Sequence, residues 1–171
     1  QTSLVGSEMC IRDRAKAAGA AMLININASP FHRGKSSERL ERVKSCAVAH
    51  QLPIIYVNQV GGQDELVFDG GSFAIDAQGE LSVSAQTFIE AFPIVTVDRS
   101  SDARLAPGDT VAEREDLDAV WQALVLGMRD YVDKNGFPGV VLGLSGGIDS
   151  AVTLAVAADA LSHERVEAVM M

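Results

Sequence analysis

The sequence predicts an α/β protein made of two structural units joined by a linker. Short apolar segments alternate with amphipathic helical segments in residues 15–98, which is typical of strands and helices packed in layers. Residues 99–115 are polar, contain Pro107 and Gly108 and show no apolar period, so we expect them to form the linker. In residues 116–171 a helix, an apolar strand, a glycine-rich turn, a second helix and a second strand follow one another. That order is typical of the first βαβ unit of a doubly wound parallel sheet.

Composition indicates an ordinary globular protein and excludes several functional classes. The 171 residues carry a net charge of −9, and 47% of them are hydrophobic. A sequence pI of about 4.7 argues against a nucleic-acid partner, which needs clustered lysines and arginines. No apolar run reaches the roughly 18 residues of a membrane-spanning helix, so no membrane partner is expected. Two cysteines are too few for a disulfide framework, which favours a reducing, cytoplasmic location.

We expect residues 1–14 to be a non-native leader. The segment has no strand or helix period and does not start with Met, and its string SLVGSEMCIRDR resembles a translated sequencing adapter. A flexible native terminus is the alternative. A cysteine beside arginines can be a low-pKa nucleophile, but Cys10 inside a leader is expected to have no function.

The first unit, residues 15–98, is expected to contain strands, turns and two helical segments. A helix ends near Gly19, because glycine is a common residue just past a helix C-terminus, and the apolar run Ala21–Ile26 suits a buried strand. The other expected elements are a helix capped by Ser36 or Ser37 that buries Leu40, Val43 and Ala47, a strand over Pro53–Val60, a break at 61–65, one or two strands within 66–76, a turn at 77–80, a strand over 81–86 and a strand over Phe92–Asp98.

The second unit, residues 116–171, is expected to begin with a long helix over Asp116–Asn135. Its apolar residues fall on one predicted face, made of Leu117, Val120, Trp121, Leu124, Met128, Tyr131 and Val132. A strand over Val140–Leu144, a helix over Ser150–Leu161 and a strand that starts at Val166 follow. Because one βαβ unit cannot cover both faces of a parallel sheet, we expect this chain to be part of a longer protein.

The strongest chemical signal is the loop GLSGGIDS, between the predicted strand and the next helix. Two glycines permit a close approach of a ligand to the backbone, and the exposed amides with the helix N-terminus can bind an anion. Serine hydroxyls can add donors. The candidate anion-binding residues are Gly143, Leu144, Ser145, Gly146, Gly147, Ile148, Asp149 and Ser150.

Asp149 adds a negatively charged side chain to this loop. A carboxylate repels a bare phosphate, so its expected partner is a Mg²⁺ ion bound to that phosphate. The loop lacks the lysine of a Walker A motif and the spacing of a dinucleotide-binding fingerprint. The structural alternative is a glycine-rich turn in which Ser145 and Ser150 only cap a helix.

These residues resemble two parts of one known family. SGGIDS matches the pyrophosphate loop of the ATP-pyrophosphatase superfamily, and YVDKNGFPGVVLGLSGGIDSAVTLAVAADAL resembles the start of an NAD⁺ synthetase domain. Upstream, NINASPFHRGK and YVNQVGGQDELVFDGGSF resemble the nitrilase-like glutaminase domain of the glutamine-dependent NAD⁺ synthetase family. The resemblance extends over about residues 15–171.

The resemblance implies a fold and a reaction. Residues 15–98 would be the C-terminal part of a nitrilase-like αββα sandwich, and residues 116–171 the N-terminal part of an adenine nucleotide α hydrolase-like synthetase domain. The implied enzyme is a ligase of NAD biosynthesis that converts deamido-NAD⁺, ATP and glutamine into NAD⁺, AMP, pyrophosphate and glutamate. It would adenylate the nicotinate carboxylate at the loop with ATP and Mg²⁺, and it would be a homo-oligomer.

Residues carried over from the family are few. Ser29 matches a glutamine-contacting serine, and Lys35 lies where some relatives place a basic residue near the glutamine carboxylate. The family's catalytic Glu, Lys and Cys have no counterpart in this chain, so we expect no catalytic glutaminase residue here. The remaining polar candidates have plainer expectations: a solvated turn for Asp64, Glu65 and Asp69, surface or loop positions for His32, His50 and His163, and a buried structural role for Cys46.

Two alternatives stay open at this point. The chain could belong to a stand-alone carbon–nitrogen hydrolase or amidase, since most residues lie in the nitrilase-like part, although a simple hydrolase needs no ATP loop. It could also be an inactive fragment that binds nucleotide weakly or not at all.

Overall fold

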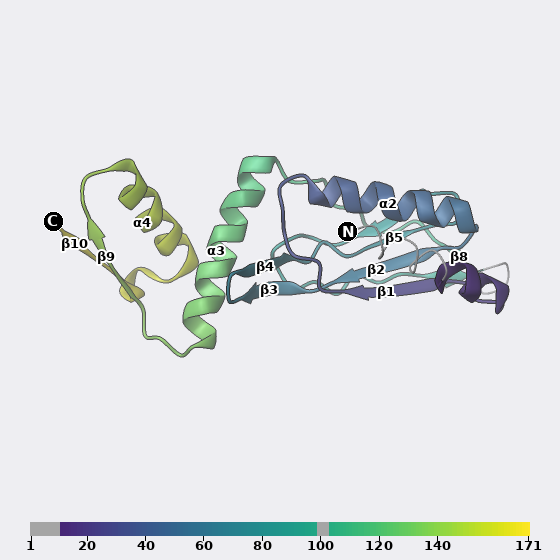
Figure 1. The fold of residues 1–171 in the computed structure, drawn as a ribbon, viewed down its shortest axis with the longest axis horizontal. Helices are drawn as coiled ribbons and strands as arrows, with labels where there is room; N and C mark the ends of the chain where they lie inside the picture. The colour runs from purple at the N-terminus through teal and green to yellow at the C-terminus, as the bar shows by residue number, and fades with distance from the viewer. Residues whose placement is uncertain (1–10, 99–102) are drawn as a thin grey trace.

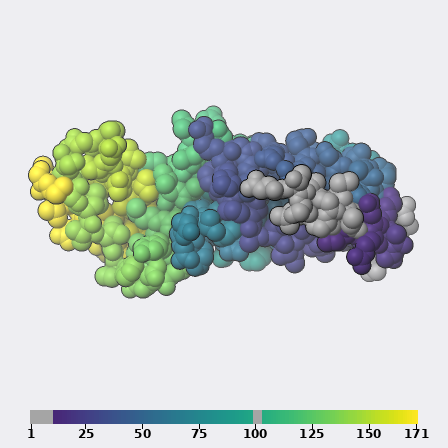
Figure 2. All heavy atoms as spheres, viewed as in Figure 1, coloured from purple at the N-terminus to yellow at the C-terminus, as the bar shows by residue number. Residues whose placement is uncertain are grey.

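The computed structural model describes residues 11–98 and 103–171, which form two lobes that meet at one long helix. The first lobe holds a four-stranded mixed sheet with a helix along one face, and the second holds a parallel strand pair with its crossover helix (Figure 1). Figure 2 shows the second lobe, in yellow-green, joined to the rest through the green surface of that long helix. Among the described residues, no helix is long and apolar enough to cross a membrane.

The four-stranded sheet has the order β1-β2-β5-β6. β1 (Leu23–Asn27) and β2 (Ile54–Asn58) are parallel and are connected by α2 (Lys35–His50). β5 (Phe73–Ile75) and β6 (Leu81–Ser84) continue the sheet in antiparallel pairing. Helical residues 11–17 precede β1, and Gly19 with φ of +82° follows them, which confirms the predicted helix end.

α2 packs its apolar stripe on this sheet, as its spacing predicts. Val43 and Ala47 are buried, and Leu40 packs against the same core, in which Tyr56 stacks on Phe73 with ring centroids 5.0 Å apart. The predicted serine cap is wrong, because α2 begins at Lys35, and its N-terminal boundary is Gly34 in the left-handed conformation, with no side-chain cap.

The opposite face of the sheet is covered by residues of the segment just before the predicted linker and by residues of the linker itself. Ala74 and Val83 form a core there with Leu105 and the partly buried Val95 and Val97. The predicted strand over Phe92–Asp98 is wrong in extent, since only β7 (Val97–Asp98) is a strand, and it pairs with β8 (Arg104–Leu105). Residues 104–105 of the predicted linker are therefore packed structure, and 99–102 lie outside the described residues.

A β-hairpin projects from the sheet toward the long helix. It consists of β3 (Val60–Gln63) and β4 (Leu66–Asp69), so the expected break at 61–65 is wrong in its first half, where Gly61 and Gly62 lie within a strand. The two strands expected within 66–76 are present as β4 and β5. The turn after β5 is confirmed, since Asp76 accepts hydrogen bonds from the N–H groups of Gln78 and Glu80 at 2.9 and 2.8 Å.

The long helix, α3 (Asp116–Lys134), is buried on two sides rather than one. Ala123 and Leu126 pack with Phe88 and the hairpin, whereas Val125 and Val132 pack toward the second lobe. The single predicted apolar face is therefore partly wrong: Leu117 is 79% exposed, and Leu124 and Tyr131 are also exposed. α3 belongs to the cores of both lobes.

The second lobe is the predicted βαβ unit. β9 (Val140–Leu144) leads through the glycine-rich loop into α4 (Ile148–Ala160), and a short 3₁₀ turn, η1 (His163–Arg165), leads to β10 (Val166–Met170). β9 and β10 are parallel, and Val156 and Ala160 of α4 pack in the core with α3. α4 begins two residues before the expected position, at Ile148 instead of Ser150.

Candidate functional site

The glycine-rich loop occupies the turn between β9 and α4, at the carboxyl end of β9. Gly146 has φ of +78°, a conformation that disfavours other residues, and a Cβ built there would meet no atom within 4 Å. Residues 145–149 are exposed. The backbone at Gly146 and Gly147 is therefore open to a ligand, as a phosphate-binding loop requires.

The serines of the loop do not cap α4. The N-cap residue is Gly147, which has no side chain to cap with, and the Ser150 hydroxyl donates instead to the Gly147 carbonyl at 2.9 Å. The hydroxyl oxygens of Ser145 and Ser150 lie 3.3 Å apart. The capping alternative is thus wrong, and the first N–H groups of α4, which have no intrahelical acceptor, remain available for an anion.

Asp149 lies in the first turn of α4, beside this row of donors. Within the part of the chain that the structure describes, its carboxylate forms no hydrogen bond or ion pair, so both oxygens are available to a cation. Oxygen ligands of this kind suit Mg²⁺, which is usually held by one or two carboxylates together with phosphate oxygens. In the described residues, no group of three or more His, Cys, Asp or Glu could hold a metal ion by itself.

A second candidate site lies at the carboxyl ends of β1 and β2, where they face the start of α2. Ser29 and Lys35 line the same cavity there, of about 490 Å³, so the structure brings the two predicted residues together. Its other charged lining residues are Arg12, Glu38, Arg39 and Arg42. Arg39 pairs with Asp69 and Arg42 with Glu38, so neither guanidinium is an unpaired cation in this cavity. Lys35 donates to the Pro30 carbonyl at 3.1 Å.

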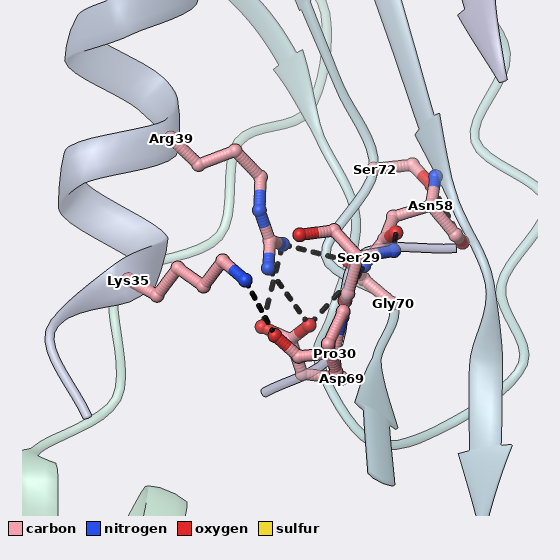
Figure 3. A network of polar contacts seen from close by, with 8 residues as sticks. All are labelled: Ser29, Pro30, Lys35, Arg39, Asn58, Asp69, Gly70 and Ser72. Carbon is pink, nitrogen blue, oxygen red and sulfur yellow. Dashed lines mark hydrogen bonds and ion pairs between the residues drawn. The ribbon is translucent and has the colours of Figure 1, made fainter. Parts of the chain in front are cut away.

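A buried polar network supports this cavity (Figure 3). Arg39 of α2 forms an ion pair with Asp69 at 3.1 Å, and their side chains are only 7% and 3% exposed. The Arg39 guanidinium also lies over the Tyr56 ring, 5.7 Å from its centroid. Its Nε is the one fully buried side-chain nitrogen or oxygen without a hydrogen-bond partner in the described part of the chain. Asp69 is therefore no solvated turn residue, and that expectation was wrong.

Asn58, at the end of β2, connects the network to Ser29, which lies in the loop after β1. Its Oδ1 accepts from the Ser29 N–H at 2.9 Å, and its Nδ2 donates to the Ser29 carbonyl, Asp69 and the Gly70 carbonyl at 3.3, 3.2 and 3.1 Å. Sequence reasoning missed Asn58 and Arg39. A signal was available, since Asn58 ends a strand beside Asn27, and Arg39 lies one helical turn after Lys35.

The remaining sequence candidates lie elsewhere. Cys46 is buried in the core under α2, as expected. His50 differs from the expected surface position, because it is buried and its Nδ1 lies 2.8 Å from the Cys46 carbonyl. Cys10 and most of the predicted leader lie outside the described residues.

The comparisons with known proteins divide the chain as its geometry does. Residues 10–106 match the carbon–nitrogen hydrolase family, over more than half of the chain. The chain belongs to the carbon–nitrogen hydrolase family. Residues 120–171 match the NAD synthase family, so a carbon–nitrogen hydrolase segment is followed by an NAD synthase segment. The first match begins at residue 10, inside the segment expected to be a leader.

Relatives that align with most of this chain are named glutamine-dependent NAD(+) synthetases. The chain is 44% identical to the one from Rhodobacter capsulatus over 156 residues, and 43% identical to the one from Acinetobacter baylyi over 151 residues. These alignments cover 91% and 85% of this chain but only 28% and 27% of the relatives. The chain thus spans about 28% of the length of the first of these curated relatives.

Two solved structures of glutamine-dependent NAD⁺ synthetases also match this chain. The glutamine-dependent NAD⁺ synthetase from Acinetobacter baumannii, solved in complex with adenosine diphosphate, superposes on 98% of this chain with a TM-score of 0.88 and 41% identity, and the match covers 31% of that protein. The enzyme from Cytophaga hutchinsonii matches 84% of this chain at a TM-score of 0.66 and 27% identity, over 23% of its own length.

Proposed function

We propose that this chain is part of a glutamine-dependent NAD⁺ synthetase, a ligase that amidates deamido-NAD⁺ at the expense of ATP. The observation that carries the proposal is the loop Gly143–Ser150, whose open backbone and uncapped helix start follow directly on a carbon–nitrogen hydrolase segment. A hydrolase acting alone needs no anion-binding loop of this kind. The relatives that share both segments favour the ligase over the stand-alone hydrolase.

Each group of this loop would have a role at the synthetase site. The amides around Gly146 and Gly147 and the first N–H groups of α4 would bind the pyrophosphate portion of ATP, with hydroxyl donors from Ser145 and Ser150. Asp149 would hold Mg²⁺ against those phosphates. When bound, the ion would neutralise the charge that develops on the leaving pyrophosphate. Fixing the phosphates in this way exposes the α-phosphorus to attack by the nicotinate carboxylate.

The Ser29 cavity would hold glutamine. Lys35 supplies a cation for the α-carboxylate of the substrate, and Ser29 a hydroxyl that can bind a polar group of glutamine. Ammonia released there would then displace AMP from the adenylated nicotinate. The glutaminase nucleophile and its partners belong to other parts of the enzyme. We further propose that the full-length enzyme is a cytoplasmic homo-oligomer that acts on these small molecules.

The domain division follows from the same proposal. Residues 15–98 would form the C-terminal part of the glutaminase domain, 99–115 the connection and 116–171 the N-terminal part of the synthetase domain. The packing of α3 on the β3–β4 hairpin supports a close contact of the two domains, since the Gly62 N–H donates to Asp130 at 2.7 Å.

The test is NAD⁺ formation by the full-length enzyme that carries this chain. With deamido-NAD⁺, ATP and Mg²⁺, either glutamine or free ammonia should support synthesis, with one AMP formed for each NAD⁺. Glutamine or amide hydrolysis in the absence of any ATP-dependent NAD⁺ synthesis would instead favour the stand-alone hydrolase.

A further inference from the structure

The side-chain amide of Asn58 is engaged on both sides by protein groups. It is buried, with 7% of its surface exposed, and it contacts both the N–H and the carbonyl of Ser29. Its own backbone N–H donates to the Ser72 hydroxyl at 3.0 Å. Asn58 thus connects the residues after β1 to the ends of β2 and β4.

The orientation of the Asn58 amide is fixed by charge. Asp69 forms an ion pair with Arg39 at 3.1 Å, and a carboxylate only accepts hydrogen bonds. The Nδ2 of Asn58 must therefore face Asp69, which leaves Oδ1 to accept from the Ser29 N–H. Figure 3 shows Arg39 reaching from α2 toward Asp69, with Asn58 next to Ser29. An aspartate at position 58 would place a second carboxylate against Asp69.

We propose that Asn58 is a positioning residue for glutamine, which it serves by holding the main chain of Ser29 in the cavity shared with Lys35. This inference rests on the proposed function and deepens it. Two hydrogen bonds to one peptide segment fix both its position and its rotation, so the Ser29 hydroxyl and the Lys35 ammonium keep a constant spacing for an α-amino acid. Arg39 and Asp69 act through Asn58 in the same way.

The kinetic test uses the full-length enzyme with Asn58→Ala and Asn58→Asp. Both variants should raise the KM for glutamine by about 10- to 100-fold, the effect of losing a buried hydrogen bond, with a smaller change in kcat. NAD⁺ synthesis from free ammonia does not use this cavity and should stay close to the parent rate. Asn135→Ala, an exposed change at the end of α3, is the matched control and should leave both reactions unchanged.

Asn58→Asp separates positioning from mere space filling, because it keeps the shape of the side chain and removes its donors. A KM for glutamine near the parent value in Asn58→Asp would overturn the proposal. If the parent enzyme made no NAD⁺ from ammonia, the proposed function would fail instead, and the following measurement would still decide the role of Asn58.

Amide hydrogen exchange in the full-length enzyme measures this contact directly. The Ser29 amide should exchange at least tenfold more slowly than that of the exposed neighbour Ala28, and Asn58→Ala should abolish the difference. Equal exchange at the two amides in the parent chain would show that Asn58 does not hold Ser29.

Discussion

Asp69 shows how a charged residue in a turn-like sequence can become the centre of a buried network. The residue stands in the string DELVFDGG, yet it is 2% exposed and is paired with Arg39, 30 positions earlier in the chain. Removing two charges from water is costly, and their pairing, the bond from Asn58 to Asp69 and the contact of Arg39 with the Tyr56 ring offset that cost. The network therefore depends on all of its members.

Replacing one member of this pair should be much worse than replacing both. Arg39→Met leaves Asp69 buried without its cation and should lower the free energy of unfolding by about 3–5 kcal/mol. The double variant Arg39→Met with Asp69→Leu should cost less than the sum of the single changes. Denaturant unfolding of the four proteins measures this coupling.

The surface ion pair on the same helix is the control. Arg42 and Glu38 are 2.8 Å apart but about two-thirds exposed, so Arg42→Met should change the free energy of unfolding by about 1 kcal/mol or less. Equal effects of Arg39→Met and Arg42→Met would show that the Arg39 pair is not the buried network described above.

At the scale of elements, the contact between the β3–β4 hairpin and α3 depends on small residues. A Cβ at Gly62 would lie 3.1 Å from both Asp130 Cβ and Gly127 Cα. The Gly62 N–H donates to Asp130, and Lys134 donates to the Gly62 carbonyl at 2.6 Å. Glycine at position 62 thus allows strand and helix backbones to approach closely enough for these bonds.

Gly62→Ala should separate strand and helix and destabilise the chain by about 1–3 kcal/mol, the usual effect of overpacking. Thermal unfolding measures the loss. Gly147→Ala is the matched change, because its φ of −85° suits alanine and the new Cβ would meet only the Ser145 hydroxyl at 3.7 Å. A Gly62→Ala protein as stable as the Gly147→Ala protein would contradict the close contact.

Elements set by local sequence could be predicted, whereas those set by distant partners could not. The apolar run Val140–Leu144 and the turn at Asp76 are as expected, because periodicity and turn residues determine them. The alternating segment Phe92–Asp98 has strand-like residues, but only Val97–Asp98 finds a pairing partner, at Arg104–Leu105. Likewise Ser29 and Lys35 were found through the family resemblance, whereas the contacts of Arg39 with Asp69 and of Asn58 with Ser29 join positions far apart in the sequence.

At the scale of the molecule, α3 links the two lobes because it contributes to two cores. Leu126 packs toward the hairpin, and Val132 packs toward α4. The hairpin ends at Asp69, which belongs to the network around the Ser29 cavity, and α4 begins at the glycine-rich loop. Damage to α3 should therefore be felt in both lobes.

Leu126→Ala should lower stability by about 2–5 kcal/mol through a cavity in the hairpin core. Amide exchange should rise in α4 as well as in β4, since both pack on the same helix. Leu124→Ala, on the exposed side of α3, is the control and should change little, because Leu124 is 50% exposed. Faster exchange confined to β4 would show that the lobes open independently.

The most direct test of the central claim, that the loop Gly143–Ser150 is the metal–pyrophosphate site of a synthetase, is the rate of NAD⁺ formation with ammonia in full-length Asp149→Ala enzyme at limiting Mg²⁺. The rate should fall about 10²-fold or more, as expected when a metal-linked contact to the reacting phosphates is removed. Glutamate release should change far less, and Asp159→Ala, farther along α4, should keep the parent rate. A near-parent rate in Asp149→Ala would contradict the assignment of this loop.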